Sequence, residues 1–579
     1  GSGLVGSEMC IRDRAYTLAE KPDKELKKLA DSVIELIGRA QEPDGYFNTY
    51  FILKEPGQRF RNLREGHELY TLGHMIEAAV AYKRATGEKR FLEIVQKMAD
   101  LVANTFGVEE GKRMGMPGHQ EIELALMKLY EETGKESYKE LAKYFIDVRG
   151  CGNRNYFLEE MKQKDVKRIF PELNDYRPEY SQSHLPVRKQ RTAEGHAVRA
   201  VYMYAAMADI AAEYDDEELL GACETLWNNM VHRRMYVTGG IGSSGILERF
   251  TADYDLPNDY NYCESCASIG LAFFARRMMQ ITKKAKYVEV MERALYNTVL
   301  AGIAMDGKSF FYVNPLEVWP PSCMERTSKE HVKSVRQKWF GVACCPANIS
   351  RTLASLGEYI YACEKDTIYV NLFIGNETQI TVGEQKVHLS LETDFPWKNQ
   401  FKINVSGVKE SVQLAVRIPE YAQDYKIFCE GREQFYKEKD GYAYITCEKN
   451  GRYEVQFVSE PRFVRANPKV RADEGKVCVM WGPLVYTVEE TDNGENLQAL
   501  YIDTAKPVKK SEKEEFPMLI AAGKRICESG WGEEELYGSH PLEFAETEIT
   551  LVPYAYWGNR ENGEMAVWLK EYLSDRNNK

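Results

Sequence analysis

The period of the hydrophobic residues changes once along this chain, and that change restricts the fold more than any other feature. From about residue 24 to residue 361, Ala, Leu, Ile and Met recur at every third or fourth position, as on one face of an α-helix. After Cys363, hydrophobic and polar residues alternate, which is typical of half-buried strands. The chain therefore combines a large helical part with a C-terminal part made of antiparallel sheets.

The helical part repeats one structural unit. A helix ends at a Thr-Gly turn, and an aromatic residue opens the next helix, as in Thr86–Phe91 and Thr133–Tyr138. Glycine suits such helix ends because it tolerates positive φ. Consecutive helical hairpins build either a solenoid or a closed α/α toroid. We count about ten substantial helices where a six-hairpin toroid needs twelve, so we expect an (α/α)6 barrel that is incomplete at its N-terminus.

Three domains follow from these patterns. We expect the helical barrel at residues 15–362, an antiparallel β-sandwich at residues 363–473 and a small β-rich domain at residues 474–579. Residues 1–14 contain no hydrophobic segment typical of a signal peptide, and we interpret them as an artefact of cloning or of sequence assembly. The strand patterns are clearest at Thr367–Ile374, Val412–Ile418, Tyr442–Cys447, Tyr453–Val458, Val477–Val488 and Glu548–Tyr556.

The net charge and the hydrophobic content of the chain restrict the kinds of molecule that it can bind. A net charge of -12 argues against nucleic acid or an anionic membrane as the main partner. No hydrophobic run approaches the length that spans a bilayer. The 36 Tyr and 8 Trp residues fit strand-rich regions and polar clefts, including sugar sites, and burial in a core explains them equally well. Exposed strands of the sandwich would allow a homodimer.

The cysteines indicate a reducing compartment. Thirteen of them, spread over 579 residues and including a vicinal pair, do not form a disulfide framework. We therefore expect a cytoplasmic location.

Two groups of thiols suggest one metal bound from two places in the sequence. Cys263-Glu264-Ser265-Cys266 and Cys344-Cys345 are separated by some eighty residues, and thiolate-rich tetrahedral sites favour Zn2+. Three interpretations stay open. They are a structural site of four thiolates, ordinary buried cysteines, and a site in which Glu264 replaces Cys263 while one thiolate faces a pocket. Glu264 and Cys266 are expected on one side of an extended segment, with a helix beginning near Ser268.

Several ionisable residues outside these thiols are candidates for a polar pocket. Five histidines in the helical domain predict that some of them converge there, although a lone helical histidine is usually structural. Glu248 follows a Gly-rich turn and reads, on local sequence alone, as a solvated acid paired with Arg249. Tyr312, in a hydrophobic segment, could direct its hydroxyl group inward. The five histidines are His67, His74, His119, His184 and His196.

Eight short segments, considered together, point to a known family. They are Gln41–Tyr46, His67–Gly87, Gly118–Glu121, Glu194–His196, Tyr236–Gly242, Asp255–Asn258, Glu264–Ala267 and Cys344–Pro346. In combination these segments resemble the β-L-arabinofuranosidases of glycoside hydrolase family 127. The resemblance covers the chain from about residue 15 to its C-terminus, and no single motif carries it alone.

The resemblance implies an (α/α)6 catalytic domain followed by β-sandwich domains, acting on plant-derived oligosaccharides or glycoconjugates. It further implies that Glu264, Cys266, Cys344 and Cys345 bind Zn2+, with Cys344 as the nucleophile of a retaining reaction and Glu248 as its general acid/base.

It also places the sugar-contacting residues. His67, His119, His196 and Tyr312 fall where the sugar would bind, with His67 preferred to His74. The main alternative is a carbohydrate-binding protein that has a structural zinc and no activity. A sugar epimerase or lyase on an α/α barrel would leave the clustered thiols unexplained.

Overall fold

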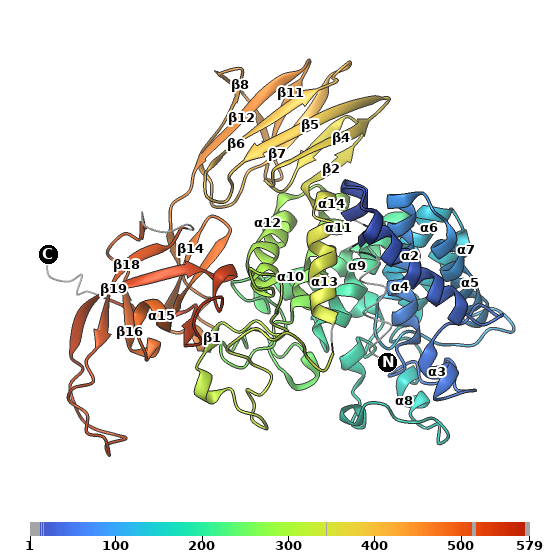
Figure 1. Ribbon diagram of the computed structural model, residues 1–579, viewed down its shortest axis with the longest axis horizontal. Coiled ribbons are helices and arrows are strands. Elements are labelled where there is room, and N and C mark those ends of the chain that lie inside the picture. The colour runs from blue at the N-terminus through green and yellow to red at the C-terminus, as the bar shows by residue number, and fades with distance from the viewer. Residues whose placement is uncertain (1–11, 13, 16, 343, 512–516, 574–579) are drawn as a thin grey trace.

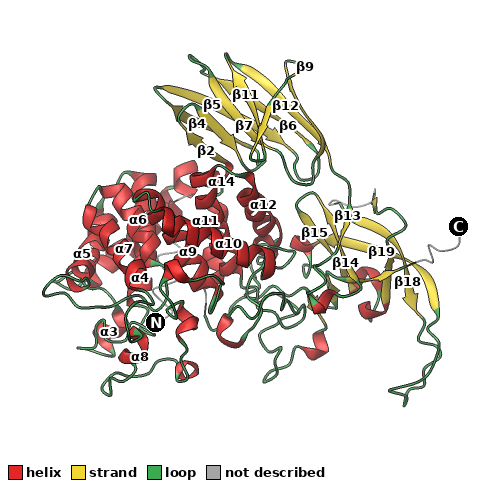
Figure 2. Cartoon of the chain, turned by 180° about the vertical axis from the view of Figure 1, so that it is seen from behind, coloured by secondary structure: helices red, strands yellow, loops and turns green. Residues whose placement is uncertain are grey.

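The chain forms a helical domain, a sandwich of two sheets and a third, C-terminal sheet (Figure 1). The computed structural model describes residues 12, 14, 15, 17–342, 344–511 and 517–573. The predicted artefact at residues 1–14 lies outside the described residues except for Arg12 and Arg14. Helix α14 (Gly357–Ile360) is followed at once by strand β2 (Tyr361–Glu364), where Figure 2 shows helices giving way to strands. The predicted change from helices to strands is therefore confirmed.

The helical domain has two layers. Helices of the inner layer are buried on almost every side, and those of the outer layer bury one hydrophobic face. The inner helices are α4 (Glu68–Thr86), α6 (Ile122–Thr133), α9 (Ala197–Glu213), α11 (Ser265–Thr282) and α13 (Cys344–Ala354), and each packs against the next. The outer helices are α5 (Arg90–Thr105), α7 (Glu136–Val148), α10 (Glu217–Arg233) and α12 (Ala285–Ala294), and α2 (Lys24–Ala40) packs against α5.

Glycine turns connect the layers as the repeat predicts. Helix α4 ends at Gly87 and α6 at Gly134, both in the left-handed region at φ 77° and 70°. Phe91 and Tyr138, the aromatic residues that follow these turns, are fully buried between the layers. The repeated unit is therefore a helical hairpin. Short helices α3 (Thr49–Leu53) and α8 (Tyr156–Glu160) lie in the connecting segments.

The middle part is a sandwich of a five-stranded and a six-stranded sheet, in the orders β10-β11-β7-β3-β2 and β4-β5-β6-β12-β8-β9. Alternate residues of facing strands, such as Ile368, Val387 and Val455, form one buried core between the sheets. The strands are β3 (Thr367–Val370), β4 (Asn376–Val382), β5 (Gln385–Thr393), β6 (Gln400–Ser406), β7 (Val412–Arg417), β8 (Gln423–Cys429), β9 (Arg432–Glu433), β10 (Lys437–Lys439), β11 (Tyr442–Cys447) and β12 (Gly451–Val458).

The third sheet extends beyond the domain boundary expected from the sequence. Strand β13 (Arg462–Val464) already pairs with β14 (Lys476–Trp481), so this sheet begins before residue 474. Strand β1 (Glu317–Val318) joins the same sheet from the helical domain. The other strands are β15 (Leu484–Glu489), β16 (Leu500–Asp503), β17 (Lys509–Lys510), β18 (Leu519–Ile526), β19 (Phe544–Pro553), β20 (Met565–Ala566) and β21 (Leu569–Tyr572).

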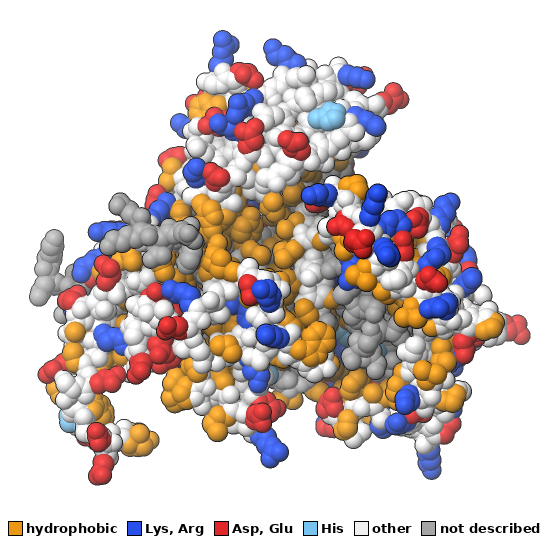
Figure 3. Space-filling view, in the orientation of Figure 1, with side chains coloured by type: hydrophobic (Ala, Val, Ile, Leu, Met, Phe, Trp, Pro, Cys, Tyr) orange, Lys and Arg blue, Asp and Glu red, His pale blue; other side chains and the backbone are white. Residues whose placement is uncertain are grey.

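The predicted strands correspond to observed strands with three adjustments. The pattern at Glu548–Tyr556 is a strand only as far as Pro553, because Tyr554–Tyr556 form a short 3-10 helix. The pattern at Thr367–Ile374 ends as a strand at Val370, and the pattern at Val477–Val488 is a hairpin that turns at Gly482, where φ is 56°. Hydrophobic side chains gather below the middle sandwich, where the three parts meet (Figure 3). Within the described segments, no helix combines the length and hydrophobicity needed to cross a membrane.

Candidate active site

A cavity of about 320 Å³ opens at the N-terminal ends of the inner helices. His67, His196 and Glu264 are the residues immediately before α4, α9 and α11, and Cys344 is the first residue of α13. All four line the cavity. Helix N-termini carry partial positive charge and stabilise anions, so this end of the helical domain suits thiolates and carboxylates.

Glu264 and three cysteines form a compact cluster at the floor of the cavity. The Sγ atom of Cys344 lies 3.3 Å from Glu264 Oε1, and that of Cys345 lies 3.6 Å from the same oxygen. Cys266 Sγ is 3.5 Å from Cys345 Sγ. One ligand atom from each of these residues falls within 4.8 Å of the others.

Cys263 does not belong to this cluster. Its backbone adopts φ 39°, which turns its side chain into a separate hydrophobic core with Tyr236 and Phe311. The expectation of an extended segment through Glu264 and Cys266 is wrong, because α11 begins at Ser265 and Cys266 lies in its first turn. Helical backbone brings Cys266 beside Glu264 instead.

Cys344 is electrostatically distinct from the other thiols. Hydrogen bonds from Cys266 and Cys345 lower the pKa of the Cys344 thiol well below its usual value, and Tyr312 contributes in the same direction. The Tyr312 hydroxyl lies 2.9 Å from Cys344 Sγ. Burial raises the pKa of Cys266 and of Cys345. The cluster therefore singles out Cys344 as the sulfur most readily ionised.

Three histidines form a row along the cavity. The ring centroids of His67 and His119 are 5.8 Å apart, and those of His119 and His196 are 5.6 Å apart. Burial, and then the charge of Arg199, lower the pKa of His67 to about 4 and that of His119 well below its usual value. Both rings place Nδ1 against a backbone carbonyl, at 2.7 Å for His67 and 2.9 Å for His119. Each neutral ring donates there, which leaves Nε2 as a hydrogen-bond acceptor.

His196 has the opposite tautomer and contacts Glu248. Its Nδ1 accepts from the Val198 N–H at 3.2 Å, so Nε2 carries the proton and donates to Glu248 Oε2 at 2.7 Å. The Tyr262 hydroxyl donates to Glu248 Oε1 at 2.9 Å. Burial acts to raise the pKa of Glu248, but the electrostatic attraction and hydrogen bond of the His196 N–H, followed by the hydrogen bond of Tyr262, outweigh it and lower that pKa.

The backbone is strained at two residues of the cavity. His67 and Glu248 both adopt left-handed conformations, with φ 53° at each, and Leu247 before Glu248 has φ 60°. Such conformations cost about 1–3 kcal/mol each in residues other than glycine and concentrate at functional sites. The Glu248 side chain, one-third exposed, is thereby turned toward His196 instead of pairing with Arg249. The interpretation as a freely solvated acid is wrong.

The structure brings the predicted site residues together and adds others. Glu248, Glu264, Cys266, Cys344, Tyr312 and the histidines at 67, 119 and 196 line one cavity, with Cys345 buried beneath them. His74 is instead buried behind the cavity, where its Nδ1 lies 3.1 Å from Glu121. Three further residues of the site, Arg199, Tyr202 and Tyr262, were not predicted from the sequence. Arg199 had a detectable signal, because it lies three residues after His196 on the same helical face.

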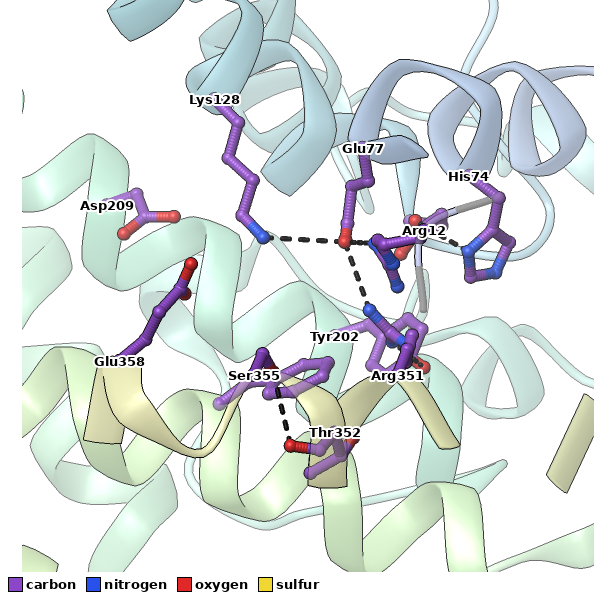
Figure 4. Close-up of polar contacts among 12 residues, drawn as sticks. Arg12, His74, Glu77, Lys128, Tyr202, Asp209, Arg351, Thr352, Ser355 and Glu358 are labelled. Carbon is purple, nitrogen blue, oxygen red and sulfur yellow. Dashed lines mark hydrogen bonds and ion pairs between the residues drawn. The ribbon is translucent and has the colours of Figure 1, made fainter. Parts of the chain in front are cut away.

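A buried ion pair holds α13 in place from below the cavity. Arg351 on α13 lies 3.1 Å from Glu77 on α4 and donates to the Tyr202 hydroxyl at 3.2 Å. Figure 4 shows Lys128, from α6, reaching the same Glu77 carboxylate, to which Arg12 also pairs. Burial, and then the charge of Arg12, lower the pKa of Lys128 to about 8. The helix that begins with Cys344 is therefore fixed against the helix that follows His67.

Replacing Arg351 with methionine is expected to lower the free energy of unfolding by about 1–3 kcal/mol, because the buried Glu77 carboxylate and the Tyr202 hydroxyl each lose a partner while Arg12 and Lys128 still pair with Glu77. Arg276→Met is the matched control. Arg276 pairs with Glu358 at 3.5 Å at a more exposed position, so its loss should cost less than about 1 kcal/mol. Urea unfolding followed by circular dichroism would measure both. Equal shifts in the two variants would contradict the assigned importance of the buried pair.

The helical domain, whose helix ends surround a small polar cavity with an ionisable thiol and a carboxyl group inside it, matches the catalytic domain of a glycoside hydrolase. The cavity, of about 320 Å³, has room for a small ligand, and the neutral imidazoles present hydrogen-bonding groups of the kind that sugar hydroxyls need. More specifically, the chain belongs to glycoside hydrolase family 127. Sequence models of that family match its catalytic domain at residues 4–358, its middle domain at 367–459 and its C-terminal domain at 461–570.

Individual relatives agree with this assignment. The chain is 39% identical over 580 aligned positions to a non-reducing end β-L-arabinofuranosidase of Bifidobacterium longum subsp. longum, covering 96% of this chain and 87% of that protein. A crystal structure of a family 127 β-L-arabinofuranosidase from Geobacillus stearothermophilus T6 is 46% identical, with a TM-score of 0.93 over 98% of this chain and 90% of the other. A second solved structure, of a family 127 β-arabinofuranosidase, is 36% identical, with a TM-score of 0.86 and coverages of 98% and 88%.

Proposed function

We propose that this glycoside hydrolase is a zinc-dependent, retaining β-L-arabinofuranosidase that removes non-reducing-end residues from plant-derived oligosaccharides or glycoconjugates. Cys344 acts as the nucleophile and Glu248 as the general acid/base. The observation that carries the proposal is that Cys344, the one thiol in the described part of the chain whose pKa is lowered, lies in the same cavity as Glu248. The activities of the relatives named above support the choice of sugar.

The cluster around Glu264 fits a zinc ion. Its donor set of three thiols and one carboxyl group suits tetrahedral Zn2+. Glu264 Oε2 is buried without a hydrogen-bond partner among the described residues, and a bound cation would satisfy it. Glu264, Cys266, Cys344 and Cys345 would hold the ion. Zinc bound there would keep the Cys344 thiol deprotonated near neutral pH and orient its sulfur.

The reaction proceeds in two displacements at the anomeric carbon. Cys344 Sγ attacks that carbon while Glu248 donates its proton to the glycosidic oxygen, so the C–S bond forms as the C–O bond breaks. Glu248, now a carboxylate, removes a proton from water, and the water oxygen attacks the same carbon to release the thiolate. Two inversions give net retention. Tyr312 donates a hydrogen bond to the Cys344 sulfur whenever it is anionic.

Sugar binding changes the protonation state of Glu248, because it changes the hydrogen bonds that the Glu248 carboxylate accepts. In the free protein, His196 and Tyr262 stabilise the carboxylate, which suits the second displacement. A sugar hydroxyl that accepts the Nε2–H of His196 removes the strongest of these contacts and excludes water. Both changes raise the pKa of Glu248 and favour the protonated form that the first displacement requires.

Hydrolysis of an aryl β-L-arabinofuranoside tests the proposed function directly. We expect release of the aryl alcohol together with β-configured arabinose, observed by proton NMR before the product mutarotates. The α-anomer of the same substrate is the control and should not be cleaved. Initial release of the α-configured sugar would contradict the retaining mechanism, and no turnover of the β-anomer would contradict the proposed activity.

The cluster also predicts how zinc responds to substitution. Cys266→Ala should weaken zinc binding by more than about 100-fold, because loss of a direct ligand exceeds the usual effect of losing an outer partner. Cys263→Ala, three residues away but outside the cluster, should retain the metal. Elemental analysis and competition with a coloured chelator would measure both variants. Equal zinc loss in the two variants would show that Cys263 is also a zinc ligand.

The same proposal extends to the fold and the compartment. We infer that the helical domain corresponds to an (α/α)6 barrel, supported by the successive packing of its inner helices and by the Glu77–Arg351 pair that joins α13 back to α4.

All twelve cysteines in the described part of the chain are free thiols, which supports the proposed cytoplasmic location.

A further inference from the structure

One wall of the cavity carries side chains that the proposed chemistry does not use. Phe170, Glu172 and Tyr180 lie in the long connection between α8 and α9, and Val342 lies on the segment that leads to Cys344. All four line the same cavity as Glu248. Glu172 is exposed and Tyr180 is half-buried, and within the described residues neither the Glu172 carboxylate nor the Tyr180 hydroxyl has a hydrogen-bond or ion-pair partner. These polar groups are available to a ligand.

The connection is held firmly enough to serve as a binding wall. Backbone N–H groups of Ile169 and Phe170 donate to the buried Glu65 carboxylate at 2.6 and 3.1 Å. Buried Arg64 donates to the Leu173 carbonyl at 2.6 Å. The Tyr180 carbonyl accepts from the His196 N–H at 3.1 Å. The wall is therefore formed before any ligand binds.

Tyr180 lies on the side of the cavity that holds the acid/base, whereas Phe170 packs against His67, with ring centroids 5.7 Å apart. The Tyr180 ring packs against His196, with centroids 5.7 Å apart, and His196 contacts Glu248. The Arg199 guanidinium lies 4.5 Å above the Tyr180 ring and fixes its orientation. Burial raises the pKa of Tyr180, the charge of Arg199 lowers it, and the charges of Glu248 and Glu172 raise it.

We propose that Glu172 and Tyr180 form a subsite for the leaving group and that it selects a neutral sugar. This rests on the proposed function, because the group whose oxygen Glu248 protonates must lie beside Glu248. The Glu172 carboxylate only accepts hydrogen bonds, so it selects hydroxyl donors and repels a uronic acid or a phosphate.

A comparison of two substrates tests the subsite. One is a disaccharide in which β-L-arabinofuranose is linked to a neutral sugar, and the other is an aryl β-L-arabinofuranoside. We expect Glu172→Gln to lower kcat/KM for the disaccharide by about 10- to 100-fold, the value of a hydrogen bond to a charged group. For the aryl glycoside it should stay within about threefold of wild type, because no hydroxyl group meets residue 172.

Glu179→Gln is the matched control, since Glu179 lies in the same connection but does not line the cavity. It should leave both substrates unaffected. Tyr180→Phe should follow Glu172→Gln, with a smaller loss. Equal losses on the two substrates, or no loss on the disaccharide, would overturn the subsite while leaving the proposed function intact. A wild-type protein inactive on both substrates would overturn the proposed function, and the subsite with it.

Discussion

Replacing Cys344 with serine is expected to reduce kcat/KM on an aryl β-L-arabinofuranoside by roughly 10⁴-fold or more, the usual effect of removing a nucleophile. The thiol of Cys344 ionises readily because Cys266 and Cys345 donate hydrogen bonds to it and because it opens helix α13. A serine hydroxyl at the same position would remain protonated. Steady-state kinetics with zinc content measured on the same sample would record the effect.

Cys345→Ser separates the role in attack from the role in binding metal. It removes a neighbouring member of the same cluster but leaves the Cys344 sulfur in the cavity. We expect its activity to recover, at least in part, when excess zinc is supplied, whereas Cys344→Ser should not recover. Recovery of Cys344→Ser, or a permanent loss in Cys345→Ser alone, would assign the attack to the other sulfur.

Replacing Glu248 with glutamine is expected to lower turnover of a sugar-linked substrate by about 10²- to 10⁴-fold, the usual contribution of a general acid/base. Glutamine is close to glutamate in shape, so the contact with Tyr262 should survive while the proton transfer is lost. An aryl glycoside with a good leaving group needs little help from an acid in the first displacement. Its second displacement still needs a base, so a glycosylated enzyme should accumulate.

That accumulation provides the measurement. Intact-protein mass spectrometry of Glu248→Gln, mixed with the aryl glycoside, should show an added sugar, and peptide mapping should locate it on Cys344. Azide, which needs no base, should restore turnover. Glu179→Gln serves as the control and should show neither the adduct nor the loss. An unmodified and fully active Glu248→Gln variant would show that another group acts as acid/base.

Periodicity predicted the fold well because the helices and sandwich strands bury regular faces. The turns at Gly87 and Gly134 were visible for the same reason, since glycine marks left-handed helix ends. Spacing alone could not choose between Cys263 and Glu264. The choice depends on one backbone angle, φ 39° at Cys263, which points its sulfur away from the other thiols. Only the resemblance to a known family selected Glu264.

Contacts between distant segments were invisible in the sequence. Nothing in the neighbourhood of Glu77 predicts a partner 274 residues away at Arg351. Tyr262 is equally hidden, because its contact with Glu248 depends on left-handed backbone at Leu247 and Glu248 that no local pattern required. Long-range packing decides these positions, and local propensity does not report it.

The placement of His67, His196, Glu264 and Cys344 at the starts of separate inner helices has a consequence for how such a protein evolves. The helices themselves form the buried layers, while the residues that act on the substrate lie in the segments that precede the helices or at their first positions. A substitution or insertion in one of those segments can therefore change which sugar is accepted without disturbing the buried layers. The connection that holds Glu172 and Tyr180 is one of these segments, and we expect related hydrolases with different preferences to differ there.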